Sequence, residues 1–333
     1  MLVGKVLIRV DGSATIGLGH IVRCMALADI LRPEFDILFV CKDISEKLVL
    51  ELQKKQLLLV KINFNSDLFD LISVNDIVVV DGYDFDLSFQ LKIKSFGCKL
   101  VCIDDTHHQE YAADLIINHG PSSNKDLYKA STYTKFALGH DYLLLRKAFL
   151  DQIPVKREIV SVNNLLVILG GSDIKNLSTH LIDHKIYEYF ETVNIVSGAS
   201  DDSYPQLKSY CEFIPNINLF NNLSDYELIK LSSKCEICIC TASGVSYEMA
   251  CVGIGMVVCM VSQNQEHFYN FFVEKQLASG VRYQNLKDIG KVIDAALSLK
   301  NSPSNVSDQI KNQKETFKND SRGLIRDAFK MIE

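Results

Sequence analysis

The chain has 333 residues, enough for about two domains of ordinary size, and a globular composition with 47% hydrophobic and 23% charged residues. Its net charge is −6 and it carries no basic block, which argues against a nucleic-acid partner. The sequence begins with a strand pattern rather than a secretory signal, and no apolar run approaches the roughly 18 residues of a membrane span. We expect a soluble, cytoplasmic protein without membrane insertion, either a monomer or a weak dimer.

Short apolar runs alternate with helix-like segments through the first half. Strands are predicted at 5–10, 36–41, 57–62, 76–81, 99–103, 114–117 and 135–138. Helices are predicted at 20–32, 44–54, 67–72 and 86–95. Strands separated by helices imply a parallel sheet covered by helices on both faces. The polar segment 152–158, which contains a proline, is the best linker candidate.

The second half repeats this α/β pattern. Strands are predicted at 164–169, 192–197, 211–214, 235–240 and 256–261. Helices are predicted at 176–189, 224–233, 245–252, 264–277 and 286–299, followed by an amphipathic tail that Gly323 could interrupt. Two such halves predict a cleft with ligands beyond the carboxyl ends of the strands.

Two groups of residues invite a metal interpretation. Cys235, Cys238 and Cys240 have a C-x2-C-x-C spacing, but they lie in a run typical of a buried strand, and no second pair follows at zinc-site spacing. Small core residues are therefore favoured there. The segment 104–108, Asp-Asp-Thr-His-His, offers good ligand types, but its adjacent side chains point in different directions.

The most informative segment is the glycine turn Gly17-x-Gly19-His20-x-x-Arg23, between the first strand and first helix. Glycines let the backbone approach a ligand closely, and N–H groups at a helix N-terminus can face an anion. Histidine is the side chain best suited to move protons near neutral pH. The alternative is a glycine-rich turn with an incidental histidine.

Six constellations then occur in a fixed order. They are the glycine turn 17–23, Asp81-Gly82-Tyr83, Ile103-Asp104-Asp105, the segment 138–149, the turn Gly170-Gly171-Ser172-Asp173 with Asn176-Leu177, and 241–248 followed by Asn264-Gln265. This set resembles the UDP-2,4-diacetamido-2,4,6-trideoxy-β-L-altropyranose hydrolases of pseudaminic acid biosynthesis, over roughly residues 3–280. It is more distantly similar to MurG-type glycosyltransferases.

The resemblance implies a GT-B fold, with two Rossmann-like domains whose parallel sheets face a central cleft. The expected domains are 1–153 for the sugar and catalysis and 160–303 for UDP, with 304–333 packing back across them by analogy. It also implies a metal-independent hydrolase without cofactor that binds a UDP-sugar and uses water as acceptor, within nucleotide-sugar metabolism and glycan biosynthesis.

The same resemblance assigns catalytic residues. His20 is expected to act as general base on water, with a structural histidine at the helix start as the alternative. Tyr83 is expected to orient water or sugar, or else to close the sheet as a half-buried aromatic. Asp11 either holds the glycine turn or contacts the sugar, and Gly17, Gly19 and Arg23 complete the expected substrate contacts in the first half.

Without a strongly basic patch, the diphosphate is expected to be held by backbone N–H groups. The candidates are the cradle at Gly170, Gly171, Ser172 and Asp173 and the helix N-terminus at Ser243 and Gly244. Glu248 matches the family glutamate that hydrogen-bonds the ribose, although glutamate is also common in a first helical turn for the dipole. Asn264 is expected close to the sugar, or else to be an N-cap without a ligand.

Three rival functions remain open at this point. A GT-B glycosyltransferase would pass the sugar to an acceptor, and a non-catalytic protein would bind the nucleotide sugar without turnover. An epimerase-hydrolase would release an epimerised sugar.

Overall fold

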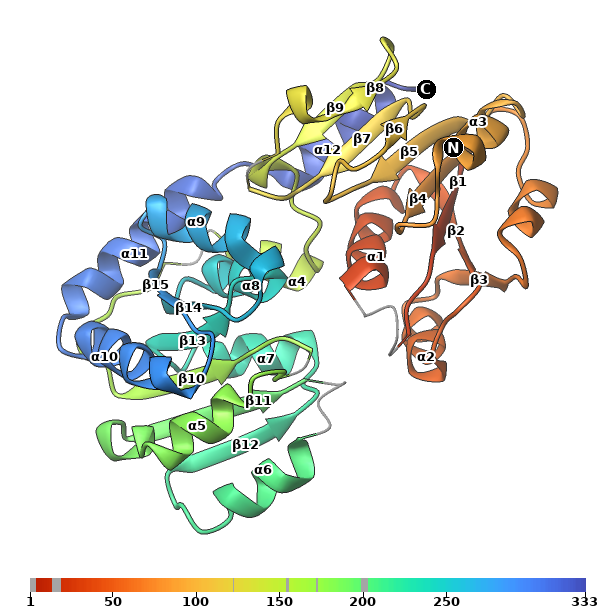
Figure 1. Ribbon diagram of the computed structural model, residues 1–333. Coiled ribbons are helices and arrows are strands. Elements are labelled where there is room, and N and C mark those ends of the chain that lie inside the picture. Colours follow the sequence, from red (N-terminus) through yellow and green to blue (C-terminus); the bar gives the residue numbers. More distant parts are fainter. Residues whose placement is uncertain (1–3, 14–18, 122, 154–155, 172, 199–202) are drawn as a thin grey trace. The chain divides into compact units, whose positions relative to one another are not determined.

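The computed structural model describes residues 4–13, 19–121, 123–153, 156–171, 173–198 and 203–333 (Figure 1). The chain divides into two compact units. The first comprises Met1–Lys147 with Asn319–Glu333, and the second is Ala148–Lys318. Two of the residues predicted to contact substrate, Gly17 and Ser172, lie outside the described residues.

The first unit contains a sheet of seven described strands, all parallel, in the order β3-β2-β1-β4-β5-β7-β9. These strands are β1 (Gly4–Val10), β2 (Phe35–Cys41), β3 (Leu58–Lys61), β4 (Ile77–Asp81), β5 (Lys99–Ile103), β7 (Leu115–Asn118) and β9 (Lys135–Leu138). The helices are α1 (Gly19–Leu31), α2 (Glu46–Lys54), α3 (Leu87–Lys94) and α12 (Ser321–Lys330), with the short α4 (Lys147–Leu150) at the unit boundary. A small separate ladder pairs β6 (Glu110–Tyr111) with β8 (Lys129–Ala130).

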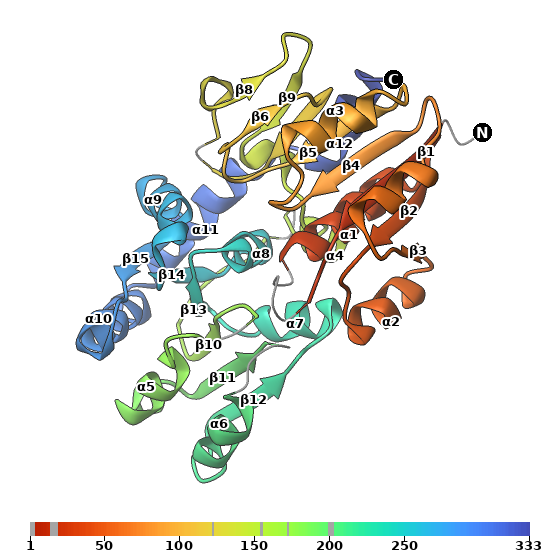
Figure 2. The same ribbon diagram turned by 45° about the vertical axis from the view of Figure 1, so that its right-hand side comes forward.

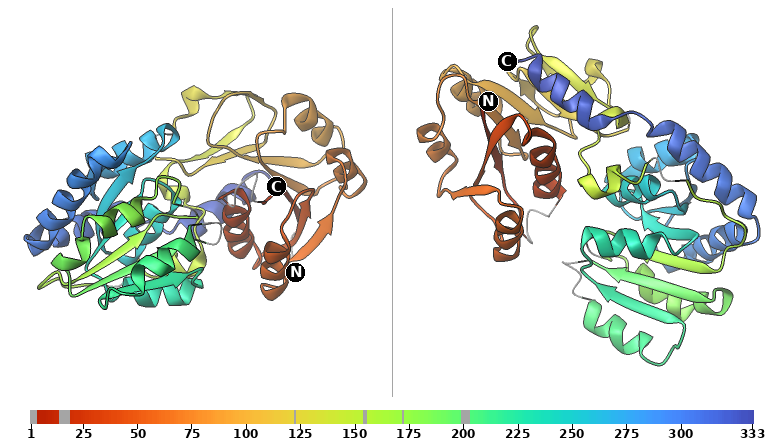
Figure 3. Two further views of the ribbon diagram at one scale, coloured as in Figure 1. Left: turned by 60° about the horizontal axis from the view of Figure 1, so that its bottom comes forward. Right: turned by 180° about the vertical axis from the view of Figure 1, so that it is seen from behind.

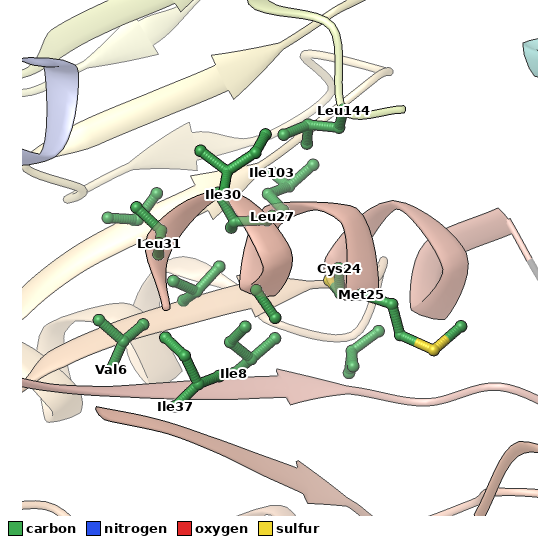
Figure 4. Packing of buried hydrophobic residues seen from close by; sticks show 14 of the residues in the cluster. Val6, Ile8, Cys24, Met25, Leu27, Ile30, Leu31, Ile37, Ile103 and Leu144 are labelled. Atoms are coloured by element: carbon green, nitrogen blue, oxygen red, sulfur yellow. The ribbon is translucent and has the colours of Figure 1, made fainter. Parts of the chain in front are cut away.

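Both faces of this sheet are buried, as the continuous apolar strands require. In β1, Val6 and Ile8 belong to the cluster under α1, whereas Leu7 belongs to the cluster on the opposite face. Figure 4 shows Leu27 and Ile30 of α1 among these core side chains. Alternate burial on two faces is typical of parallel sheets covered by helices.

The last helix, α12, belongs to the first unit and contacts α1 and β9. Figures 2 and 3 show this C-terminal helix beside the strands of the first unit. Ile325 and Phe329 join the core under α1, and the Phe329 ring lies 6.2 Å from that of Phe35. Gly323 lies inside α12 and does not interrupt it, because the break in the tail falls between Thr316 and Ser321.

The second unit contains six described parallel strands in the order β12-β11-β10-β13-β14-β15. They are β10 (Asn164–Ile168), β11 (Thr192–Ser197), β12 (Ile217–Asn221), β13 (Ile237–Thr241), β14 (Gly255–Met260) and β15 (Ser279–Arg282). The helices are α5 (Leu177–Asp183), α6 (Tyr204–Cys211), α7 (Asp225–Ser232), α8 (Gly244–Val252), α9 (Glu266–Glu274), α10 (Ile289–Lys300) and α11 (Pro303–Thr316).

One predicted strand is wrong. The run 211–214 is the end of α6 and the turn after it, and the edge strand is β12 instead. Pro205 stands in the first turn of α6, where its fixed φ favours a helix start, and Leu207 and Cys211 face the core one helical turn apart. The apolar run therefore marks the buried side of a helix.

Candidate functional site

Residues of the predicted glycine turn and of β4 meet at the switch point of the first sheet. β1 pairs with β2 on one side and with β4 on the other, so the connections after β1 and β4 leave from the same edge. In parallel α/β sheets, ligands bind beyond the carboxyl ends of the strands at such a point. His20 stands in the first turn of α1, and Asp81 is the last residue of β4.

The imidazole of His20 is held by the carboxylate of Asp81. Nδ1 of His20 lies 2.6 Å from Oδ1 of Asp81, across 61 positions of sequence. Nη2 of Arg23, which can only donate, also lies 3.0 Å from this nitrogen. We assign the proton to Nδ1, because at the shorter distance a bare Nδ1 would point its lone pair at a carboxylate oxygen. In the neutral ring the lone pair is then on Nε2, which can accept a proton.

Asp81 is buried and remains ionised. Burial alone would raise the pKa of its carboxyl, but the charge and hydrogen bonds of Arg23 and the hydrogen bond of His20 lower the pKa to about 2. Arg23 donates from Nε to Oδ2 at 2.7 Å and from Nη2 to Oδ1 at 2.6 Å, and the thiol of Cys24 donates to Oδ2 at 3.3 Å. With four donors around it, this carboxylate orients the imidazole of His20 and stays ionised.

Arg23 links Asp81 to a second carboxylate. Its Nη1 donates to Oδ2 of Asp105 at 3.0 Å, and the charges of both aspartates raise the pKa of the guanidinium despite its burial. Arg23 was expected to contact substrate. The structure places its guanidinium in two ion pairs within the protein, so a direct substrate contact stays a prediction.

Tyr83 follows β4 and lies beside His20. The two rings are in edge-to-face contact with centroids 5.1 Å apart, and the phenol donates to Oδ2 of Asp105 over 3.5 Å. The side chain is 56% exposed. Partial burial and the negative charge of Asp105 raise the pKa of the phenol to about 12, so Tyr83 stays protonated at neutral pH.

Asp11 is engaged in bracing the strand ends. Arg9 donates two hydrogen bonds of 2.7 Å to the carboxylate of Asp11. The N–H groups of Lys42 and Asp43 donate to its Oδ1 at 2.7 and 2.9 Å. Burial raises the pKa of Asp11, but the bonds from Arg9 and from the backbone outweigh it and lower the pKa overall. These contacts join the ends of β1 and β2, and both alternatives for Asp11, holding the glycine turn or contacting the sugar, stay predictions.

A second histidine, His119, is a weaker candidate for a base than His20. Burial, together with the nearby charge of Arg23, lowers its pKa to about 3. Its Nδ1 accepts a hydrogen bond of 3.1 Å from the N–H of Leu144. An imidazole with so low a pKa stays unprotonated at neutral pH and is a weak base. His20 is therefore the better candidate for a base than His119.

The motifs contain Asp81 and Asp105 but predict no place for either residue in the site. One sequence signal does point to them. Both aspartates stand at the carboxyl ends of predicted strands, where ligand sites form, and His20 and Arg23 are spaced i, i+3 on one helix face that can meet them.

The second unit also places its candidate residues at a switch point, between β10 and β13. Gly170 follows β10 with φ +87°, a conformation that favours glycine. The backbone of Gly198 approaches so closely that a Cβ there would lie 2.3 Å from the carbonyl oxygen of Gly170 and 2.4 Å from that of Gly171. The chain after β11 thus packs closely against the turn after β10.

The N-terminus of α8 follows β13 directly. Ser243 is its N-cap residue, but its side chain makes no capping hydrogen bond to the helix, and Gly244 is exposed. Backbone N–H groups at such an end favour an anion. Glu248 lies one turn further along and is buried.

Two other predicted residues have protein partners. The carboxylate of Asp173 accepts from the N–H groups of Leu177 and Ser178, both at 2.8 Å, and so satisfies the start of α5. Asn264 lies exposed in a 3-10 turn before α9, where its Oδ1 accepts from the hydroxyl of Ser262 at 2.6 Å. Its place near a sugar stays a prediction.

Among the described residues, no group of three or more His, Cys, Asp or Glu side chains is arranged to hold a metal ion. Asp104 instead accepts from the N–H groups of Thr106 and His107 and from the hydroxyl of Tyr111 at 2.7 Å. All ten cysteines are buried with free thiols. Within the described part of the chain, every helix is too short or too polar to cross a bilayer.

Comparison with known proteins supports the resemblance expected from the motifs. The chain is 26% identical over 283 residues to the UDP-2,4-diacetamido-2,4,6-trideoxy-beta-L-altropyranose hydrolase of Campylobacter jejuni, covering 81% of this chain and 97% of that one. It is also 26% identical to an uncharacterized protein of Methanocaldococcus jannaschii over 87% of this chain, and spans 62% of that relative's length. A spore coat polysaccharide biosynthesis protein of Bacillus subtilis is 25% identical over 77% of the chain. The chain matches no protein-family model.

Solved structures establish the fold. MurG of Acinetobacter baumannii superposes with a TM-score of 0.65 at 13% identity, covering 98% of this chain and 100% of that one. The spinosyn rhamnosyltransferase SpnG gives a TM-score of 0.65 at 12% identity over 97% of this chain and 99% of its own. The chain therefore has the GT-B fold of these glycosyltransferases, with two parallel-sheet α/β domains, as the motifs predicted.

Proposed function

We propose that the chain is a hydrolase that removes UDP from UDP-2,4-diacetamido-2,4,6-trideoxy-β-L-altropyranose with inversion at the anomeric carbon, a step of pseudaminic acid biosynthesis. The observation that carries the proposal is the bond between Nδ1 of His20 and Asp81, which leaves Nε2 as the base. The similarity to the Campylobacter jejuni hydrolase supports the choice of sugar.

In this mechanism His20 activates water. Nε2 takes one proton from the water while the water oxygen bonds to the anomeric carbon. The bond from that carbon to the diphosphate oxygen breaks, and its electron pair leaves with UDP. The Asp81 carboxylate stabilises the imidazolium that forms, as in other carboxylate-oriented histidine bases. Tyr83, in contact with the His20 ring, assists in placing the water.

We assign UDP to the second unit. The diphosphate would be held by N–H groups at the turn of Gly170 and Gly171 and at the start of α8, Ser243 and Gly244. Glu248 would accept from the ribose hydroxyls. As the resemblance implies, hydrolysis is expected to proceed without a metal ion or other cofactor.

The decisive experiment is a proton NMR time course with the diacetamido UDP-sugar, with UDP-N-acetylglucosamine as the control. We expect the free, inverted sugar from the first substrate only, at an unchanged rate in EDTA. H20A should abolish turnover and keep UDP affinity within a few fold. Near-normal activity of H20A would exclude His20 as the base.

A glycosyltransferase is the second candidate, because the solved structures that superpose on this chain include glycosyltransferases. It predicts slow hydrolysis of the UDP-sugar and a large acceleration when an acceptor is added. A non-catalytic protein would give UDP binding and no product in either condition. The same NMR time course, run with and without acceptor sugars, separates these outcomes.

A further inference from the structure

Asp105 is a charged residue that the proposed mechanism does not use. It follows β5, the neighbour of β4 in the sheet, and its side chain is 35% exposed. Its Oδ2 accepts from Nη1 of Arg23 at 3.0 Å and from the hydroxyl of Tyr83 at 3.5 Å. The carboxylate thus touches both the buried arginine and the exposed phenol beside the base.

The neighbouring Asp104 shows that this arrangement is particular to Asp105. Asp104 is buried, and its oxygens serve the local turn through Thr106, His107 and Tyr111. One aspartate of the pair therefore shapes the loop, and the other points toward Arg23 and Tyr83.

The contacts around Asp105 form a closed circuit. His20 bonds to Asp81, Asp81 to Arg23, Arg23 to Asp105, and Asp105 to Tyr83, whose ring returns to the edge of His20. Each link restrains the next, so the position of the phenol is coupled to that of the base. The 3.5 Å separation exceeds that of an optimal O–H···O bond, and such bonds often tighten when substrate binds.

We propose that Asp105 is a positioning residue that draws the phenol proton of Tyr83 toward itself, so that Tyr83 presents an oxygen lone pair to the attacking water. This inference rests on the proposed hydrolysis. The water gives one proton to Nε2 of His20 and donates its other O–H to the Tyr83 oxygen. Its remaining lone pair is then directed at the anomeric carbon, and the diphosphate leaves with the electrons of the broken bond.

The electrostatic surroundings of Tyr83 agree with this role. The charged and titratable groups that face it are Asp105, Arg23 and Asp81, together with the rings of His20 and His108. After burial, the Asp105 charge is the largest cause of the raised pKa of about 12. An ionised carboxylate accepts hydrogen bonds but cannot donate them, so it keeps the phenol proton of Tyr83 directed toward Asp105.

The test is a double-mutant cycle on the full chain with the variants D105N, Y83F and the double variant D105N/Y83F. We expect D105N to lower kcat by about tenfold or more, with KM changed by less than about threefold. In the Y83F background the same replacement should cost less than about threefold, because its target is gone. D84N is the matched control: Asp84 is exposed next to Tyr83, and its replacement removes the same charge with no expected change in kcat.

A second readout follows the phenol directly. In protein labelled with 13C-tyrosine, with Y83F to assign the signal, Tyr83 should titrate near pH 12 and at a lower pH in D105N but not in D84N. The wild-type titration remains informative even where D105N fails to fold. An ordinary pKa near 10 in the wild type, or a D105N loss that is undiminished in the Y83F background, would overturn the inference. A wild type that hydrolyses nothing would instead overturn the proposed function, since the cycle requires an active enzyme.

Discussion

Arg23 and Asp81 form a two-point ion pair in the interior of the first unit, with Nε on one carboxylate oxygen and Nη2 on the other. Because His20 shares the same Oδ1, the ion pair also fixes where the base can be. A buried carboxylate that holds a cation and a histidine at once links the stability of this unit to its proposed chemistry.

The first prediction concerns D81N. Each carboxylate oxygen of Asp81 accepts two hydrogen bonds. In D81N the amide nitrogen replaces one of these oxygens and must therefore face a donor, whichever of the two it replaces. Where it faces His20, the proton moves to Nε2 and the base is lost. We expect kcat to fall on the order of 10³- to 10⁴-fold, as for an asparagine beside other catalytic histidines. Steady-state hydrolysis assays measure this loss of kcat. The control is the affinity for UDP, measured by calorimetry, which should change little.

The second prediction is a pH dependence of stability. The pKa of Asp81 is lowered from 3.8 to about 2 in the folded state. A depressed pKa contributes stability that is present above the unfolded-state pKa of 3.8 and is lost as the pH falls through the folded-state pKa of about 2. The shift corresponds to about 2 kcal/mol. Urea unfolding between pH 5 and pH 2 should show a loss in wild type that exceeds the loss in D81N by that amount.

The control for this pH series is D84N, whose exposed carboxylate forms no hydrogen bond with another described residue. It should lose as much stability as wild type on acidification. Parallel curves for wild type and D81N would contradict a strongly ionised, buried Asp81.

The third prediction concerns the glycine turn of the second unit. In G198A the added Cβ would collide with the carbonyl oxygens of Gly170 and Gly171, so the turn must move. We expect unfolding to become easier by about 1–3 kcal/mol, as for overpacked sites. UDP affinity should fall about tenfold or more if this turn cradles the diphosphate. G290A, at an open position of α10, is the matched control. It should leave UDP affinity nearly unchanged and raise stability by up to about 1 kcal/mol, because alanine favours a helix more than glycine does.

The fourth prediction concerns the C-terminal helix. Phe329 is fully buried in the core under α1, so F329A should destabilise the first unit by about 3–5 kcal/mol. M331A, two residues further at an exposed position, should change stability by less than about 0.5 kcal/mol. Urea unfolding of the full chain distinguishes the two, and equal small effects would mean that α12 is not part of that core.

Much of the local structure could be predicted from the sequence. Apolar runs bounded by turn residues placed the strands β1, β2, β4 and β5 within a residue or two, since a strand buried on both faces needs such a run. The pattern was ambiguous where the chain was short or amphipathic. The apolar run at the end of α6 wrongly predicts a strand, and the pattern at β15 predicts no strand.

The sequence by itself determined which residues stand at strand ends and helix starts, because those positions depend on local periodicity and turn chemistry. It placed His20 and Asp81 at two such ends but could not say that they meet. Only the tertiary structure decided this, because the pairing of β1 with β4 rather than with β3 depends on how helices pack over the whole sheet. The same holds for Asp105, whose proposed role follows from β5 lying next to β4. It also holds for α12, which belongs to the first unit although the residues before it, up to Lys318, belong to the second.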